Sequence, residues 1–200
     1  MIISTLLIVS SFLLITPPVI SEEKIIVTEC DKLVSHSEDP DRVAPGVKKV
    51  LLVAGTAACR DAVQKYPDNP RLRYQLARVL FYSEVTNESI SHLEFAAKAG
   101  SEQAQFVLGY IADEGLQGVE RSVCIIEDLW FRSAVQGRFA SLVSYPRHLA
   151  LGKFDKCKVQ ASSATVLDFL DQAKHKASGY YQNLLVQDVT TQYRNFIDKN

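Results

Sequence analysis

Apolar side chains recur along this chain with the spacing of amphipathic helices, and no stretch alternates as a half-buried strand would. Turn-forming residues separate the first two predicted helices, and short connections join most of the later ones. Short connections make neighbouring helices pack antiparallel. The predicted helices span about residues 24–35, 50–66, 70–82, 87–99, 101–113, 121–136, 138–150, 162–176 and 178–197. The pattern therefore predicts an all-α chain of about nine helices.

The N-terminal segment has a different pattern. Residues 1–21 carry no charged side chain, and the apolar run from Ile2 to Ile15 is followed by two prolines and then by charge at Glu22. This pattern predicts a signal peptide at 1–21, although the usual basic residues are missing. The alternative is an uncleaved anchor, but the prolines cut the run short of the roughly 20 apolar residues that span a bilayer. We therefore expect an exported protein, periplasmic or extracellular, without stable membrane insertion after cleavage.

Size and charge narrow the function classes. About 180 residues remain after the signal peptide, from 22 to 200, which is enough for a single compact domain. The net charge of −1 argues against a nucleic-acid partner, because such partners call for clustered Lys and Arg.

All four cysteines follow the predicted signal peptide, and an even count in an exported chain suggests two disulfides. Three pairings are compatible with the sequence. In a hairpin that turns near residue 43, Cys30 and Cys59 fall at similar heights on facing helices. In the hairpin that turns at Gly137, Cys124 lies near the start of one helix and Cys157 just beyond the end of its partner. The helix map therefore favours Cys30–Cys59 and Cys124–Cys157; the alternative is unpaired core cysteines in a reducing cell.

Two hairpins in the middle of the chain overlay with an offset of 32 to 37 residues. That offset is the length of a two-helix solenoid unit. Most of the equivalent positions carry small residues, which allow helix backbones to approach closely. The overlaid positions are Leu76-Ala77, Ala96-Ala97, Gly100 and Ala104 in the first hairpin, and Leu108-Gly109, Phe131, Ala134, Gly137 and Ala140-Ser141 in the second.

The second hairpin contains three segments of a known repeat pattern. They are Ala104-Gln105-Phe106-Val107-Leu108-Gly109-Tyr110-Ile111, Gly115-Leu116-Gln117-Gly118-Val119 and Trp130-Phe131-Arg132-Ser133-Ala134-Val135-Gln136-Gly137. They resemble the A-x-x-x-L-G-x-x-Y, G-x-G-V and W-F-x-x-A-x-x-G motifs of the Sel-one-like repeat (SLR) family, a branch of the tetratricopeptide-like helical repeats. The chain departs by one extra residue in the second segment and by Ala112 where an aromatic residue is usual.

The resemblance covers about residues 70–145 and implies a short right-handed α-solenoid of antiparallel helix hairpins. Residues 22–66 would then form an N-terminal hairpin stapled by a disulfide, and 70–150 would hold the repeat units. Residues 159–200 would cap the solenoid, because an end repeat must hide its apolar face, or would fold back over the groove.

Catalytic signatures are missing from the sequence. It has no G-x-S-x-G, H-E-x-x-H, G-x-x-x-x-G-K-[ST] or C-x-x-C motif, and its one S-x-x-K match, Ser21 to Lys24, straddles the predicted cleavage site. The four histidines have no ligand spacing typical of zinc sites, so no metal or cofactor is expected.

We expect a non-enzymatic scaffold, adaptor or regulator that binds a protein in the cell envelope. The alternative is an envelope enzyme acting on a β-lactam or peptidoglycan-type substrate, since some exported SLR proteins are linked with β-lactams. A membrane-tethered assembly subunit is a third hypothesis.

The resemblance also implies a binding surface, because the first helix of each unit in such proteins lines a concave face. Aromatic and arginine side chains are typical of binding hot spots. The alternative for Phe81 and Phe106 is buried packing. A groove with so few units would be shallow and would suit a peptide or a single helix. The residues placed on this face by register are Tyr74, Arg78, Phe81, Phe106, Tyr110, Asp113 and Arg147.

Overall fold

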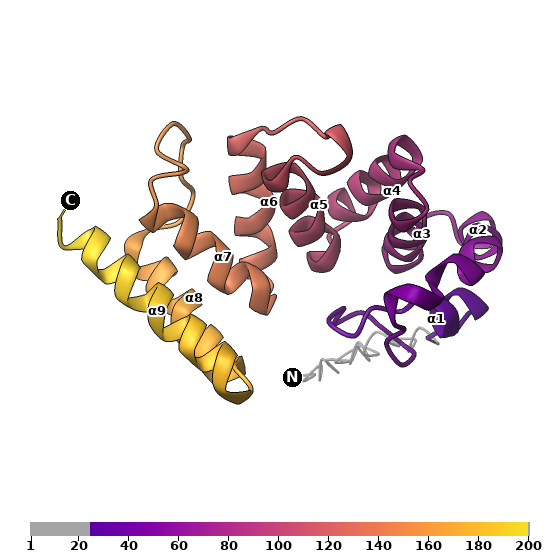
Figure 1. Cartoon of the computed structure of the whole chain (residues 1–200), viewed down its shortest axis with the longest axis horizontal. Helices are drawn as coiled ribbons and strands as arrows, with labels where there is room; N and C mark the ends of the chain where they lie inside the picture. The colour runs from indigo at the N-terminus through magenta and orange to yellow at the C-terminus, as the bar shows by residue number, and fades with distance from the viewer. Residues whose placement is uncertain (1–24, 200) are drawn as a thin grey trace, which may run out of the picture.

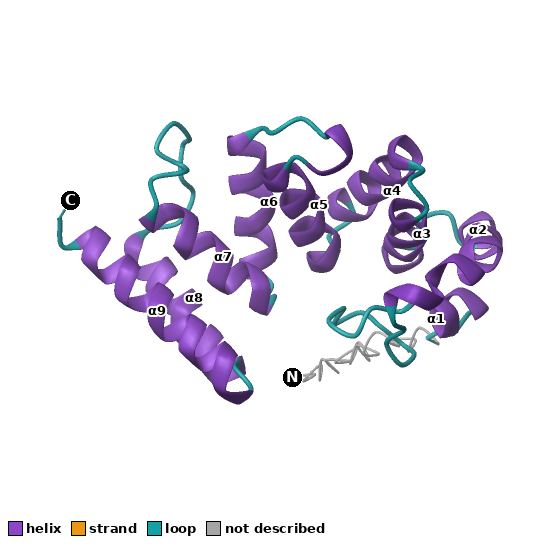
Figure 2. Ribbon diagram, in the orientation of Figure 1, coloured by secondary structure: helices purple, strands orange, loops and turns teal. Residues whose placement is uncertain are grey.

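The computed structural model describes residues 25–199, and its secondary structure within them is entirely helical (Figures 1 and 2). The predicted signal peptide, residues 1–21, lies outside the described residues. The described helices are α1 (Glu29–Val34), α2 (Thr56–Lys65), α3 (Pro70–Tyr82), α4 (Thr86–Lys98), α5 (Glu102–Glu114), α6 (Val123–Val135), α7 (Phe139–Ala150), α8 (Ser163–Lys176) and α9 (Gly179–Ile197), with two 3-10 helices, η1 (Lys49–Gly55) and η2 (Leu116–Gly118).

The helices follow one another around an arch (Figure 1). Each of α3 to α7 packs on the next helix in the chain, and both α8 and α9 pack on α7. The N-terminal helices form one limb of the arch and α7 to α9 form the other, with the loop after α1 on the inner side. The expected all-α solenoid of helix hairpins is therefore the architecture of the described chain.

Local sequence signals explain where the repeat helices begin and end. The Asn69 side chain accepts a hydrogen bond from the Leu72 N–H at 3.2 Å, and Pro70 takes the first helical position, where a missing N–H costs nothing. Ser101 caps α5 in the same way. Gly100 and Gly137 follow α4 and α6 with φ values of 99° and 87°, a left-handed conformation that glycine adopts without strain.

The predicted helix at 24–35 is too long. It starts only at Glu29, because Thr28 and Asp31 form a capping box in which each side chain bonds the other's backbone N–H. The predicted helix at 50–66 is also interrupted: it opens as the 3-10 helix Lys49–Gly55 before α2 begins. Gly55 lies so close to Val34 that a Cβ there would collide with it, which explains the small residue.

The repeat motif has a clear packing role in the second hairpin. The indole N–H of Trp130 on α6 donates to the Phe106 carbonyl on α5 at 3.0 Å. A Cβ on Gly109 would collide with this indole ring, so glycine allows α5 and α6 to approach. The glycine and tryptophan positions of the motif are thus the two sides of one contact.

Buried apolar side chains form three clusters along the arch. The first surrounds Cys30 and Cys59, the second lies between α3, α4 and α5, and the third surrounds Tyr145 and Phe169 on α7 and α8. Both expected disulfides are present, Cys30–Cys59 in the first cluster and Cys124–Cys157 between α6 and the loop after α7. Among the described residues, no helix has the length and apolar character needed to cross a membrane.

Candidate functional site

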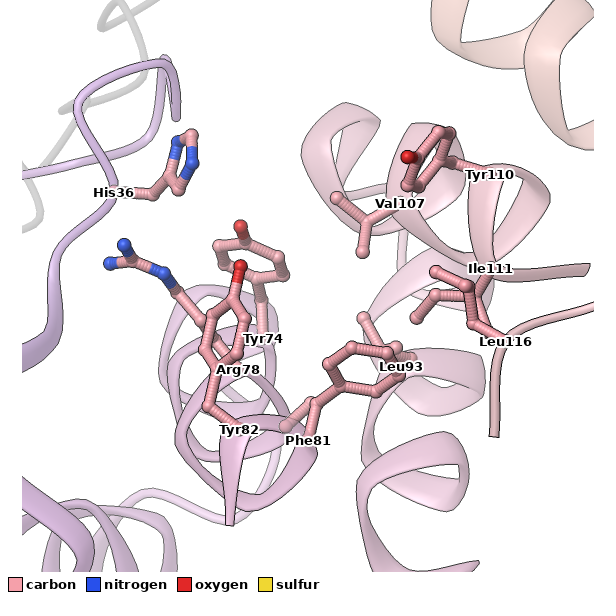
Figure 3. A pocket seen from close by; sticks show the side chains of 11 residues that line it. His36, Tyr74, Arg78, Phe81, Tyr82, Leu93, Val107, Tyr110, Ile111 and Leu116 are labelled. Carbon is pink, nitrogen blue, oxygen red and sulfur yellow. The ribbon is translucent and has the colours of Figure 1, made fainter. Parts of the chain in front are cut away.

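A cavity of about 130 Å³ opens between α3 and α5 (Figure 3). Its base is apolar, and phenol groups, one imidazole and one guanidinium stand around it. The lining residues are His36, Tyr74, Ala77, Arg78, Phe81, Tyr82, Leu93, Val107, Tyr110, Ile111 and Leu116. We call this the α3–α5 cavity.

Helix periodicity explains how α3 and α5 supply the two walls. Tyr74, Arg78 and Phe81 follow one another at spacings of four and three residues and therefore share one face of α3. Val107 and Tyr110 share a face of α5 for the same reason. In Figure 3 the two sets face one another, and Leu93 lies next to Phe81 at the base of the space between them. The Tyr110 side chain is 46% exposed, so an outside partner can contact it.

Tyr74 belongs to the wall of the cavity but hardly reaches solvent, with an exposed fraction of 2%. Its hydroxyl accepts a hydrogen bond from the Gln103 side chain at 3.0 Å. Burial raises the pKa of this phenol well above its usual range, so it stays protonated at physiological pH. Tyr74 therefore shapes the cavity and offers little surface to a partner.

The loop after α1, residues 35–48, closes one side of the cavity. Arg78 donates hydrogen bonds to the carbonyls of Val34 at 2.6 Å, Ser35 at 2.9 Å and Val47 at 3.1 Å, and so fastens both ends of the loop to α3. Burial lowers the pKa of its guanidinium. The expected partner-binding arginine is thus engaged by the chain's own backbone, an arrangement that the sequence pattern did not predict.

The first part of the loop reaches the residue before α7. Glu38 lies 3.7 Å from the guanidinium of Arg138, the residue that precedes α7. Arg138 also donates from Nε to the Gln103 side chain at 2.6 Å. Since Gln103 in turn bonds Tyr74, a chain of polar contacts runs across the inner side of the arch from α3 through α5 to the loop.

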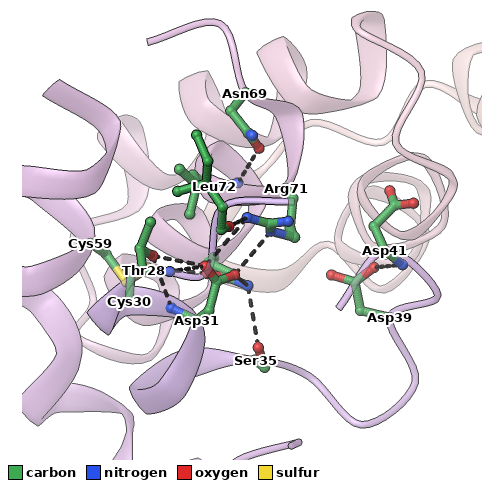
Figure 4. A network of polar contacts seen from close by, with 12 residues as sticks. Thr28, Cys30, Asp31, Ser35, Asp39, Asp41, Cys59, Asn69, Arg71 and Leu72 are labelled. Atoms are coloured by element: carbon green, nitrogen blue, oxygen red, sulfur yellow. Dashed lines mark hydrogen bonds and ion pairs between the residues drawn. A yellow bond between two sulfur atoms is a disulfide. The ribbon is translucent and has the colours of Figure 1, made fainter. Parts of the chain in front are cut away.

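A second network holds the start of this loop in place (Figure 4). The Asp31 carboxylate is fully buried and accepts hydrogen bonds from the Thr28 N–H at 2.7 Å and from the Gln75 side chain at 3.0 Å. Its Oδ1 also lies 2.9 Å from Arg71 Nε, and Oδ2 accepts from the Arg71 Nη2 group at 3.3 Å. Gln75 reaches Ser35 as well, at 3.4 Å. Side chains of α3 therefore bind α1 and the loop as one unit.

Two ionisable side chains on the loop have shifted pKa values. Burial raises the pKa of the Asp39 carboxyl from 3.8 to about 6, and its Oδ2 is buried without a hydrogen-bond partner among the described residues. Burial also lowers the pKa of His36 from 6.5 to about 4, and the positive charges of Arg78 and Arg138 add to this shift. In the folded protein the Asp39 carboxyl therefore loses its proton only at a higher pH, and the His36 ring gains a proton only at a lower pH, than in an unfolded chain.

These shifts affect stability in opposite directions over the same pH range. The raised Asp39 pKa contributes stability that is present below pH 3.8 and is lost as the pH rises through about 6. The lowered His36 pKa contributes stability that is present above pH 6.5 and is lost as the pH falls through about 4. The loop therefore combines two pH dependences that partly cancel.

Asp39→Asn is expected to stabilise the protein by about 3 kcal/mol at pH 7.5 and by only about 1 kcal/mol at pH 4.5, because asparagine removes the buried charge and keeps a side-chain acceptor. The measurement is urea unfolding of both proteins at the two pH values. The exposed Asp61→Asn on α2 is the matched control and should show no such pH-dependent gain. An equal effect of Asp39→Asn at both pH values would contradict the predicted burial of the charge.

The seven predicted groove residues are not all brought together. Tyr74, Arg78, Phe81 and Tyr110 line the α3–α5 cavity. Phe106 lies beside it, partly buried, and stacks on both Tyr110 and Trp130, with ring centroids 6.3 Å and 5.9 Å away.

Asp113 and Arg147 lie apart from the cavity. Asp113 is paired with Arg121 at 2.6 Å and with His148 at 3.0 Å, and burial lowers the pKa of that imidazole. Arg147 is exposed. It lies on the side of α7 that packs against α9, and it lines a surface depression together with residues of α9. Register along single helices places residues on a face but does not say which neighbour covers that face.

The sequence pattern missed several residues of the cavity. His36 comes from a loop that is distant in sequence, and only the folding of that loop onto α3 brings it to the site. Val107 could have been found, since it lies one helical turn before Tyr110 on the predicted face. The other lining residues that were missed are Ala77, Tyr82, Leu93, Ile111 and Leu116. In the described part of the chain, no group of three or more His, Cys, Asp or Glu side chains is arranged to hold a metal ion.

Comparison with known proteins supports the fold. The sequence matches no protein-family model, and no curated protein matches it significantly. Among solved structures, the chain is similar to the crystal structure of a Sel1 repeat protein from Oxalobacter formigenes, with a TM-score of 0.52 and 18% identity. The similarity covers 65% of this chain and 95% of that one. With the helix hairpins and the contact between Gly109 and Trp130, this likeness shows that the chain has a Sel1-like repeat fold.

Proposed function

We propose that this protein is an exported, non-enzymatic helical-repeat protein that binds a segment of another protein in the cell envelope, where it acts as a scaffold, adaptor or regulator. The observation that carries the proposal is the α3–α5 cavity, an apolar pocket on the surface beside the exposed ring of Tyr110. Apolar concavities with a few polar groups at their edge are typical of binding sites. The fold supports the same role, since stacked helix hairpins form extended concave surfaces.

The proposed export rests on two independent features. The charge-free segment 1–21 has the pattern of a signal peptide. All four cysteines are paired in two disulfides, which form and persist in oxidising compartments such as the periplasm and the cell exterior. Under this proposal the mature protein begins at Glu22 and forms one domain, with α8 and α9 as its C-terminal cap.

Site-specific crosslinking in the source cells tests the proposed binding. A photoreactive side chain at position 110 is expected to give a discrete crosslinked protein, because this position stands at the edge of the cavity. The same group at position 91, an exposed residue of α4 that does not line the cavity, is the matched control. With the purified partner, Tyr110→Ala should weaken binding by about tenfold or more, as expected for an aromatic hot spot, and Ser91→Ala should not.

The proposal fails if position 110 gives no crosslinked protein. It also fails if positions 91 and 110 capture the same protein to the same extent. Both variants must show the thermal unfolding of the unmodified protein, so that lost binding is not confused with lost structure.

A further inference from the structure

A group of exposed apolar side chains lies at the start of α9. Spacings of one, three and four residues place its four members on one side of the first two helical turns. Buried positions on α9 begin only at Val186, so the first turns extend past the helices that cover the rest of it. In Figure 1 the turn between α8 and α9 forms the free end of this limb of the arch. The four side chains and their exposed fractions are Tyr180 at 74%, Tyr181 at 83%, Leu184 at 48% and Leu185 at 38%.

Positively charged side chains stand beside this group. The segment 172–187 contains two lysines and one histidine but no Asp or Glu. Lys174 and Lys176 are both exposed, and among the described residues no carboxylate lies within ion-pair distance of either. Lys176 donates one hydrogen bond to the Gly137 carbonyl at 2.7 Å, which leaves two of its three N–H donors for a ligand. We call residues 174–185 the α8–α9 tip.

The nearest acidic side chains do not cancel this charge. Asp171 on α8 lies 3.5 Å from the His175 ring, and Asp188 lies more than two helical turns into α9. Glu102 on α5 interacts electrostatically with Lys176 but lies beyond ion-pair distance of it. The two lysines therefore give the α8–α9 tip a net positive charge without any contribution from His175.

This combination of side chains fits a lipid surface that carries negative charge. Tyrosine is enriched where a membrane meets water, because its ring is apolar and its hydroxyl is polar. Leucine side chains on an amphipathic helix enter the boundary between headgroups and acyl chains. Lysine keeps its ammonium group at the headgroups while its stem covers apolar surface, and anionic lipids attract it. The α8–α9 tip supplies all three features within 12 residues of chain.

A second copy of the chain fits this surface less well. A stable protein interface takes about 20–30 residues from each side, whereas the α8–α9 tip offers four large apolar side chains. A two-fold contact brings the same surface of both copies together. The lysines of one tip would then approach those of the other, and like charges repel each other.

We propose that the α8–α9 tip docks this protein on the surface of an anionic lipid bilayer. Tyr180, Tyr181 and Leu184 enter the interface, and Lys174 and Lys176 contact lipid phosphates. The contact is peripheral, and no described helix crosses the bilayer. The inference goes beyond the proposed function, because it uses a different surface from the α3–α5 cavity.

Sedimentation with vesicles tests the inference on the mature, disulfide-bonded protein. Vesicles of equal parts phosphatidylglycerol and phosphatidylcholine are expected to bind it at least about tenfold more tightly than vesicles of phosphatidylcholine alone, because each lysine near an anionic surface contributes about fivefold. A spin-labelled lipid in the same vesicles should broaden the NMR amide signals of residues 180–185 more than those of the other helices.

Paired variants separate the two contributions. Tyr180→Ser with Tyr181→Ser should weaken binding to the anionic vesicles by about tenfold or more, and so should Lys174→Gln with Lys176→Gln. Ile125→Ser with Leu151→Ser is the control for lost exposed apolar surface, since these side chains are 58% and 55% exposed and lie outside the tip. Lys156→Gln with Lys158→Gln is the control for overall charge, because both lysines are exposed on the loop after α7. Both control proteins should bind as the unmodified protein does.

Three results overturn the inference. One is equal binding to anionic and neutral vesicles, and another is unchanged binding by the Tyr180→Ser, Tyr181→Ser variant. The third is a dimer in analytical ultracentrifugation that this variant abolishes, because a second copy then covers the tip. None of them affects the proposed function, since crosslinking through position 110 reports on the α3–α5 cavity and should persist in the tip variants.

Discussion

Asp31→Ala is expected to lower the free energy of unfolding by about 3–5 kcal/mol, because it leaves the Arg71 guanidinium without its buried partner. The side chain of Arg71 is only 11% exposed, and that of Asp31 is fully buried. The variant also removes the acceptor for the Thr28 N–H and so the start of α1. Urea unfolding at neutral pH measures the change.

The control for this prediction is the exposed Asp61→Ala on α2, whose expected effect lies within about 0.5 kcal/mol. A double-mutant cycle with Arg71→Met adds a second measurement. The double variant should lose less than the sum of the two single variants, since no unpaired charge then remains buried. Additive losses, or a loss below about 1 kcal/mol for Asp31→Ala, would show that the network does not hold α1 and the loop.

Replacing both Cys30 and Cys59 by alanine is expected to cost about 3.5 kcal/mol or more. The two disulfides close loops of similar length, with sequence separations of 29 and 33, so the chain-entropy model predicts about 3.5 kcal/mol for each. Cys30 and Cys59 are both fully buried, so replacing this pair by alanine also removes side-chain volume from the core. Helix α1 has only six residues and needs this link, because isolated short helices are unstable.

The Cys124–Cys157 pair is the matched comparison. Cys124 is exposed and Cys157 partly so, and replacing both should cost about 3.5 kcal/mol without the extra loss of core packing. In the native protein, a mild reductant should therefore reach this disulfide first. A larger loss from the Cys124–Cys157 replacement, or earlier reduction of Cys30–Cys59, would contradict the predicted role of burial.

The loop over the inner side of the arch has consequences for binding. Arg78 forms part of the wall of the α3–α5 cavity and also holds the loop on α3. A substitution of Arg78 would therefore change both the shape of the cavity and the position of the loop. For this reason the binding test uses Tyr110, which lies on α5 and not on the helix that holds the loop. Loss of binding in the Tyr110→Ala variant then reports on the cavity itself.

The helices of the repeat region follow closely from local sequence. Apolar spacing sets the face of each helix, Asn69 and Ser101 mark helix starts, and Gly100 and Gly137 mark the turns. The disulfide pairing followed from the same map, because antiparallel hairpins bring the paired positions to similar heights. The N-terminal helices were predicted less well, since the capping box and the 3-10 segment shorten them against their apolar pattern.

The sequence by itself determined that this protein is a chain of antiparallel helix hairpins with two disulfides, because helix periodicity, caps and turns act over a few neighbouring residues. Only the tertiary structure decided which side chains form the candidate site. Arg78 bonds carbonyls more than 30 residues before it in the chain, and His36 joins α3 and α5 only when its loop folds back. Such contacts depend on how whole helices pack, and no local pattern encodes them.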